Sequence, residues 1–307
     1  MSLQSRHSIA VAAIGLLIAA ACSPTASQSP SASPGSPVGS PSNTATAGQV
    51  AGRVSYADGR PLPGAHVLVI GVEYATELDL QSDSDGTYGG VIEQQDANYR
   101  MAAWVESPFE GETYRFPLEP VGDPDTHFRG ADGFAKDFVW RLTGRGSWAS
   151  HLQADDRSGL IGGIVGVFVY DPLTDPTAAS ALALPVGSII DVTLTPLTPL
   201  VDGSDAQPIT VTITIEEETG PYTIGEVGAL TDVPLGRYEA TATVTEPGGT
   251  ARGLVVGATC TRSGCPLKPA ALADTAELLF PPADPLVHSR PFQRQPVAGL
   301  ALYVQLP

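Results

Sequence analysis

One segment of the chain gathers several side chains that could do chemistry. Between Asp123 and Gly133 the sequence reads Asp-Pro-Asp-Thr-His-Phe-Arg-Gly-Ala-Asp-Gly. Carboxylate and imidazole groups can bind cations or transfer protons, and loops on a rigid scaffold often carry binding residues. We expect either a surface loop held by its own salt bridges and Asx turns, or a site for a ligand or ion. The candidate residues are Asp123, Asp125, His127, Arg129 and Asp132.

A second acidic segment resembles the opening of a calcium-binding loop. Asp83 and Asp85 precede Gly86, and Glu77 and Asp79 lie a few residues before them. Calcium needs about six to eight oxygen ligands in one place, and the full loop signature is missing here. The favoured interpretation is a turn in which the aspartate side chains accept backbone N–H bonds. Calcium binding by Asp83 and Asp85 is the weaker alternative.

Two histidines have aspartates close to them in the sequence. His127 follows Asp125, and His151 precedes Asp155. A histidine held by a carboxylate can act as a general base, so an extracytoplasmic hydrolase is one possible function. The sequence has no Gly-x-Ser-x-Gly elbow and no phosphate-cradling glycine loop. We therefore predict no catalytic residue, no metal and no cofactor.

Four aromatic residues could form a flat platform for sugars. They are Trp104, Tyr114, Phe116 and Trp140. Alternation along the strands that we expect places many of them on an inner face instead. Core packing is therefore the favoured interpretation.

The strands that could position these candidate side chains come after an N-terminal segment that has a different role. An apolar run from Ile9 to Ala21 is shorter than the roughly 20 residues that a membrane-spanning helix needs. It fits the apolar part of a signal peptide, which we place at residues 1–21. Its end, Ala19-Ala20-Ala21-Cys22, resembles a bacterial lipobox, in which a cysteine receives diacylglycerol. We expect a lipid on Cys22 and an extracytoplasmic protein anchored to the bacterial cell membrane; an ordinary secretory signal is the alternative.

The cysteine count agrees with a lipidated Cys22. The chain has three cysteines, and an odd cysteine in an exported protein needs an explanation. Lipidation of Cys22 leaves Cys260 and Cys265 as a pair, for which we expect a disulfide outside the cytoplasm. The loop between them is short, so the bond contributes at most about 2 kcal/mol to stability.

Composition describes the linker and limits the partners. Residues 22–47 are almost entirely Ser, Pro, Ala, Thr and Gly, which predicts a disordered, semi-stiff tether. The whole chain carries a formal charge of −17, and its lysines are Lys136 and Lys268. An acidic surface repels nucleic acid and anionic headgroups. We expect no nucleic-acid partner, and membrane contact through the lipid anchor alone.

The rest of the chain predicts short strands joined by turns. We therefore expect an all-β fold that consists of two tandem β-sandwiches. We place the first sandwich at residues 48–144 and the second at 158–307, where a diverged repeat of the first with the same topology is one interpretation. The strands expected in the first are 49–57, 65–72, 88–92, 98–105, 113–118 and 137–142. Those expected in the second are 160–170, 189–194, 209–215, 222–230, 239–244, 250–256, 276–280 and 297–306.

Three short motifs in the first half resemble the carboxypeptidase regulatory-like domain. They are Gly52-Arg-Val, the segment 58–65 (Asp-Gly-Arg-Pro-Leu-Pro-Gly-Ala) and the segment 83–88 (Asp-Ser-Asp-Gly-Thr-Tyr). The resemblance implies a small transthyretin-like (prealbumin-like) sandwich. It implies little about activity, because this module is an accessory domain beside a protease.

A zinc carboxypeptidase site would need a glutamate three residues after a histidine. Valine, glycine, alanine or proline stands at that place after each histidine beyond the signal peptide. We therefore predict no carboxypeptidase activity. The leading hypothesis is a non-catalytic cell-envelope lipoprotein that binds or displays a carbohydrate, an envelope component or a protein partner. The alternatives are the hydrolase above and a mechanical spacer.

Overall fold

The computed structural model describes most of the chain beyond residue 44. The described residues are 45–73, 76–123, 125–147, 149, 152–153, 156–169, 184–216, 226–260, 269–280 and 299–307. They form strands and short 3-10 turns, and no α-helix occurs among them. Among the described residues, no helix is long and apolar enough to cross a membrane. The expected signal peptide, Cys22, nearly all of the linker, His151, Asp155, Cys265 and the side chain of Cys260 lie outside the described residues.

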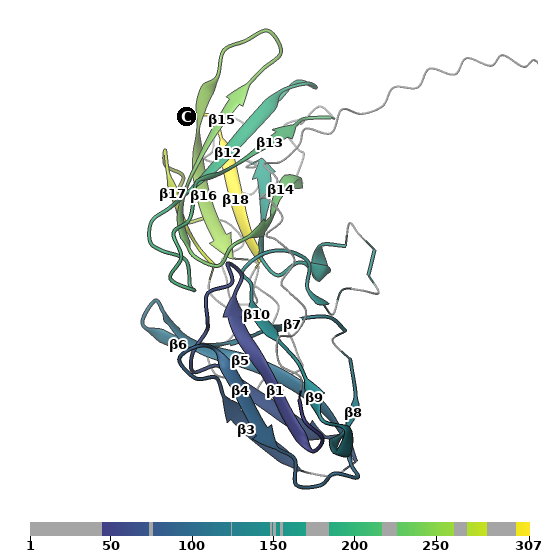
Figure 1. Ribbon diagram of the computed structural model, residues 1–307. Helices are drawn as coiled ribbons and strands as arrows, with labels where there is room; N and C mark the ends of the chain where they lie inside the picture. Colours follow the sequence, from purple (N-terminus) through teal and green to yellow (C-terminus); the bar gives the residue numbers. More distant parts are fainter. Residues whose placement is uncertain are drawn as a thin grey trace, which may run out of the picture. The chain divides into compact units, whose positions relative to one another are not determined.

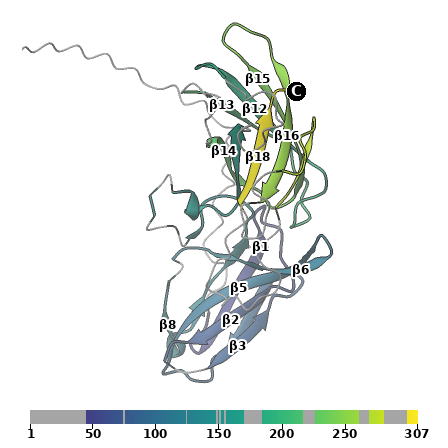
Figure 2. The same ribbon diagram turned by 180° about the vertical axis from the view of Figure 1, so that it is seen from behind.

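The first sandwich has two sheets. One contains β1 (Gln49–Tyr56), β4 (Thr87–Val91), β7 (Glu119–Pro120), β9 (Phe134–Ala135) and β10 (Phe138–Trp140). Its order is β4-β1-β10-β7, with β9 beside β1. The other contains β2 (His66–Gly71), β3 (Glu77–Gln81), β5 (Asn98–Phe109), β6 (Glu112–Pro117) and β8 (Phe128–Arg129). Its order is β3-β2-β5-β6, with β8 beside β5. The sheet with β1 is in front in Figure 1 and the sheet with β5 is in front in Figure 2.

Alternation along these strands builds the core between the two sheets. Successive side chains of a strand point to opposite faces, and every second residue of β5 from Tyr99 to Val105 belongs to the buried core. Val50 and Phe138 from the facing sheet are 1% exposed. The Asp58-Gly59 turn after β1 works because Gly59 has a φ of +86°, which glycine adopts without strain.

The second sandwich is one long sheet that curls on itself. Its strands are β11 (Gly163–Val169), β12 (Ile189–Pro196), β13 (Ile209–Thr214), β14 (Glu226–Val233), β15 (Arg237–Thr245), β16 (Arg252–Cys260), β17 (Ala276–Leu279) and β18 (Gly299–Gln305). The order is β13-β12-β15-β16-β18-β11-β14, with β17 beside β15. The two end strands of this sheet lie close to each other: a Cβ added to Gly228 of β14 would be 2.8 Å from the side chain of Ile213 on β13.

Each sandwich contains a parallel pairing between its first strand and its last strand. β1 pairs in parallel with β10, and Val54 lies opposite Phe138. β11 pairs in parallel with β18, and Ile164 lies opposite Gly299. In each half a strand from the start of the module therefore lies beside one from its end.

The structure confirms the all-β, two-sandwich fold class and corrects several details. β3 is not among the predicted strands, although Glu-Leu-Asp-Leu-Gln alternates polar and apolar residues along its length. β5 continues to Phe109, beyond the predicted end at Val105, because β6 pairs with its second half. β10 is confined to Phe138–Trp140, shorter than predicted.

Candidate functional site

The outward face of the β3-β2-β5-β6 sheet carries a cluster of planar polar side chains. Register brings them together: His66 on β2 lies opposite Gln81 on β3 and Trp104 on β5. One step along the sheet, Glu106 on β5 lies opposite Arg115 on β6. Cross-strand neighbours in a sheet are close enough for their side chains to touch. The outer-face cluster, as we call it, consists of His66, Asp79, Gln81, Trp104, Glu106 and Arg115.

A stack of three flat groups is the centre of the outer-face cluster. The rings of His66 and Trp104 are parallel within 2°, with centroids 5.0 Å apart. The guanidinium carbon of Arg115 lies 4.9 Å from the centre of the Trp104 ring, within the range of a cation–π contact. Trp104 is only 8% exposed. The indole therefore serves as a rigid support for its neighbours rather than as an open platform.

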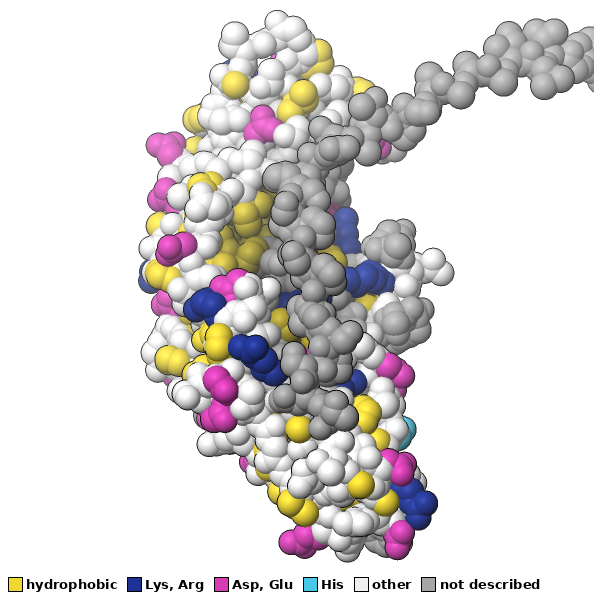
Figure 3. Space-filling view, in the orientation of Figure 1, with side chains coloured by type: hydrophobic (Ala, Val, Ile, Leu, Met, Phe, Trp, Pro, Cys, Tyr) yellow, Lys and Arg dark blue, Asp and Glu magenta, His cyan; other side chains and the backbone are white. Residues whose placement is uncertain are grey.

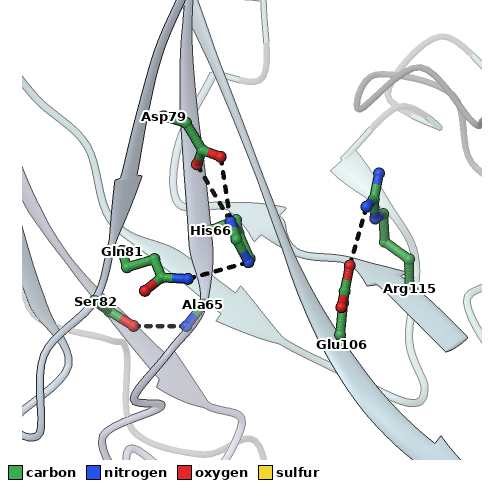
Figure 4. Close-up of polar contacts among 7 residues, drawn as sticks. All are labelled: Ala65, His66, Asp79, Gln81, Ser82, Glu106 and Arg115. Atoms are coloured by element: carbon green, nitrogen blue, oxygen red, sulfur yellow. Dashed lines mark hydrogen bonds and ion pairs between the residues drawn. The ribbon is translucent and has the colours of Figure 1, made fainter. Parts of the chain in front are cut away.

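The imidazole of His66 is held on both sides by polar partners. Its Nδ1 lies 3.3 Å from Oδ1 of Asp79, and its Nε2 lies 3.3 Å from the amide nitrogen of Gln81. A carboxylate only accepts hydrogen bonds, so Nδ1 of the neutral ring carries the hydrogen and Nε2 accepts one from Gln81. Figure 4 shows both contacts converging on the ring from β3.

An ion pair between Arg115 and Glu106 forms the other end of the stack. Arg115 donates through Nη2 to Oε1 of Glu106 at 3.0 Å, an ion pair also drawn in Figure 4. Both side chains are about a third or more exposed, so this pair contributes at most about 1 kcal/mol to stability. Nε of Arg115 and Nε1 of Trp104 are buried and have no hydrogen-bond partner in the described part of the chain. Buried donors are normally paired, so these two are exceptions, and their burial keeps them from contact with an external ligand.

The inward side of the same edge strand borders a pocket. Leu78 on β3, Val69 on β2 and Tyr99 on β5 line it together with residues 91–94. Its volume is about 360 Å³, within the size range of small-ligand pockets. β3 therefore borders the outer-face cluster on one side and this pocket on the other.

The loop from Asp123 to Asp132 contains the expected Asx turn. Oδ1 of Asp123 accepts from the amide of Asp125 at 3.0 Å, and Arg129 pairs with Asp96 rather than with a residue of its own loop. Lys136 is buried beneath the loop and donates to the carbonyl of Asp123. Burial lowers the pKa of Lys136.

The side chains of the candidate set in this loop do not converge in the structure. Asp123, Asp125, His127, Arg129 and Asp132 are all exposed. Among the described residues, no group of three or more His, Cys, Asp or Glu side chains could hold a metal ion. His127 makes no hydrogen bond to Asp125 within the described residues, and His151 and Asp155 lie outside them.

Asp83 and Asp85 form a tight acidic turn before β4. The amide of Thr87 donates to Asp83 at 3.0 Å and to Asp85 at 2.9 Å, and Gly86 has a φ of +79°. Hydrogen bonding to the Asp83 side chain, followed by that to Thr87, lowers the pKa of Asp85 to about 2. The carboxylate oxygens are thus used for backbone bonds, as in the turn interpretation.

The four aromatic residues do not form a common platform. Tyr114, Phe116 and Trp140 belong to the buried core of the first sandwich, as core packing predicts. Trp104 is buried too, but on the outward face.

On the face seen in Figure 3, acidic side chains form small separate groups.

The outer-face cluster is not among the sites predicted from the sequence. Its signal was the alternation of β3, which places Asp79 and Gln81 on one face and Leu78 and Leu80 on the other. The sequence alone suggests Asp79 only as a neighbour of the possible calcium loop. Recognising β3 as a strand would have placed Asp79 and Gln81 on the outward face of a sheet.

Comparison with known proteins identifies no family. No protein-family model matches the chain, and no curated protein sequence does. The Bacillus anthracis TIE protein aligns over 76% of this chain with 9% identity and a TM-score of 0.31. The chain spans 43% of that protein. The shaft pilin SpaA of Lactobacillus rhamnosus GG, in a mutant form, aligns over 68% of this chain and 93% of its own, with 12% identity and a TM-score of 0.21. Likenesses this weak carry no functional argument.

Proposed function

We propose that the protein is a non-catalytic binding protein of the bacterial cell envelope. A lipid on Cys22 anchors it outside the cytoplasm, and its first sandwich is a carboxypeptidase regulatory-like module. The outer-face cluster binds a carbohydrate. The observation that carries this proposal is the rigid stack of His66, Trp104 and Arg115, bordered by two carboxylates.

The chemistry of the cluster suits a hydroxyl-rich ligand. Each sugar hydroxyl can donate one hydrogen bond and accept others. Asp79 and Glu106 supply acceptors, with side chains 53% and 40% exposed, and Arg115 and Gln81 supply donors. Stacking and ion pairing hold these groups in place before a ligand arrives. Preorganisation of this kind lowers the entropic cost of binding.

Binding is testable on a glycan array with the Gly35–Pro307 unit, which contains all described residues. We expect retention of at least one glycan class and a loss of about tenfold or more in affinity for Arg115→Ala, because a charge-assisted hydrogen bond contributes about 1.5–3 kcal/mol. Asp79→Ala should lose affinity as well.

Arg60→Ala is the matched control. Arg60 also lies over an aromatic ring, 4.4 Å from the centre of Tyr56, and pairs with Asp58. It is not part of the outer-face cluster, so this variant should bind like the wild type. Equal binding by all three variants, or no retained glycan, would refute the assignment. Turnover of a bound glycan would refute the non-catalytic proposal.

The anchor has its own test. Mass spectrometry of the protein purified from bacterial membranes should find a mature N-terminus at Cys22 that carries diacylglycerol. Cys22→Ser should release the protein from the membrane fraction or leave its signal peptide uncleaved. A mature chain that begins at Cys22 with an unmodified thiol would contradict the lipid anchor.

A further inference from the structure

The pocket of the first sandwich lies between the two end strands of its sheets. β3 ends one sheet and β4 ends the other. The lining comes from the start of β3, the end of β4 and the residues after β4. Gly90 lets the two strands come close, because a Cβ at this position would lie 2.8 Å from Cδ2 of Leu80.

The floor of the pocket is part of the hydrophobic core. Val69, Ile92 and Tyr99 line it and are 1%, 3% and 4% exposed. An apolar side chain placed there would extend the core at about 25 cal/mol per Å² of apolar area removed from water. The hydroxyl of Thr76 also lines the pocket, is buried, and has no hydrogen-bond partner in the described part of the chain. The pocket thus offers apolar contact and one unused polar group.

The edge of β4 beside the pocket has backbone groups that no other described residue pairs with. The amide of Ile92 donates to the carbonyl of Gly48 on the β1 side at 2.9 Å. Alternate amides of an antiparallel strand point the same way, so those of Gly89 and Val91 point to the free edge. β4 has none of the lysines, prolines or bulges that usually protect an edge. The side chain of Val91 is 63% exposed.

Two carboxylates at the pocket have no cationic partner among the described residues. Glu77 and Glu93 line it and are exposed, and neither forms a salt bridge with a described residue. They add to a chain with a formal charge of −17. The complementary occupant is therefore cationic as well as partly apolar.

We propose that this pocket and the β4 edge bind an extended peptide that alternates apolar and basic side chains. The peptide adds a strand to β4, which is a common mode of peptide recognition. An apolar side chain enters the pocket over Val69 and Ile92, and its basic neighbours face Glu77 and Glu93. This site is separate from the outer-face cluster and goes beyond the proposed glycan binding.

The test uses the full-length chain in a non-ionic detergent and a fluorescent Lys-Leu-Lys-Leu-Lys peptide with blocked ends. We expect anisotropy to show binding that weakens about tenfold in Val91→Pro, which removes an amide from the free edge without removing a bond to β1. Val91→Thr keeps that amide and should bind like the wild type. Tryptophan emission, to which the buried Trp104 and Trp140 of this sandwich contribute, checks that each variant is folded.

Charge is tested separately. Glu77→Gln combined with Glu93→Gln should weaken binding by about tenfold at low salt and by less at high salt, since exposed charges are screened. The same peptide with glutamate in place of lysine should not bind. Equal affinity of Val91→Pro and wild type, or no binding of the basic peptide, would overturn the proposal. Concentration-dependent dimers that Val91→Pro abolishes would also overturn it, by identifying a second copy as the occupant.

Discussion

Replacing Tyr238 by alanine is expected to destabilise the second sandwich by about 3–5 kcal/mol, the usual cost of deleting a buried aromatic side chain. Tyr238 on β15 is completely buried. Its ring meets Phe280 edge-on, with centroids 5.8 Å apart, and its hydroxyl donates to the carbonyl of Pro234 at 3.0 Å. Alanine would leave a cavity and an unpaired carbonyl at the same place.

Urea unfolding followed by far-UV circular dichroism measures this effect, because all tryptophans of the chain precede the second sandwich. Tyr238→Phe keeps the ring and loses only the hydroxyl, so it should cost about 1 kcal/mol. A loss below about 1 kcal/mol for Tyr238→Ala would show that the ring does not support this core. Equal losses for the two variants would assign the effect to the hydroxyl alone.

Gly52→Ala should have a comparable effect on the first sandwich, with a loss of about 3 kcal/mol or more. A Cβ on Gly52 would lie 1.8 Å from the carbonyl oxygen of Lys136 and 2.6 Å from the hydroxyl of Tyr88. That hydroxyl donates to the same carbonyl at 2.5 Å. The added methyl group must therefore displace both the chain before β10 and the tyrosine. Tryptophan fluorescence during urea unfolding reports the loss, because Trp104 and Trp140 are buried in this sandwich.

Gly89→Ala is the matched control for Gly52→Ala. Gly89 lies in the paired strand β4, but a Cβ there would meet nothing nearer than the carbonyl of Val50 at 3.5 Å, an ordinary contact. Alanine at this position should change stability by less than about 1 kcal/mol. Similar losses for both variants would mean that the close approach at Gly52 is not the cause.

Much of the fold could be predicted because period-two alternation is a local signal. Ile209–Thr214 alternates isoleucine or valine with threonine and forms β13 as expected. The alternation of β3 is equally clear, but Glu77 and Asp79 at two of its polar positions also suggest metal ligands. Strand ends such as that of β5 depend on which strand lies alongside, so they follow from pairing rather than from propensity.

The outer-face cluster could not be predicted in the same way. His66 and Trp104 are far apart in the sequence and meet only because the β2–β5 register places them opposite each other. A shift of one residue would turn one of them to the other face. The polar residues of the loop from Asp123 to Asp132 are close in sequence, yet they form no metal-holding cluster with other described residues.

The parallel pairing of β1 with β10 and of β11 with β18 has a consequence for how the chain folds. Each contact joins residues separated by most of a module, so the entropy of closing a long loop opposes it before any native packing offsets that cost. Folding rates fall as contacts become less local. Each sandwich is therefore expected to fold slowly and to complete its core only after its final strand is present.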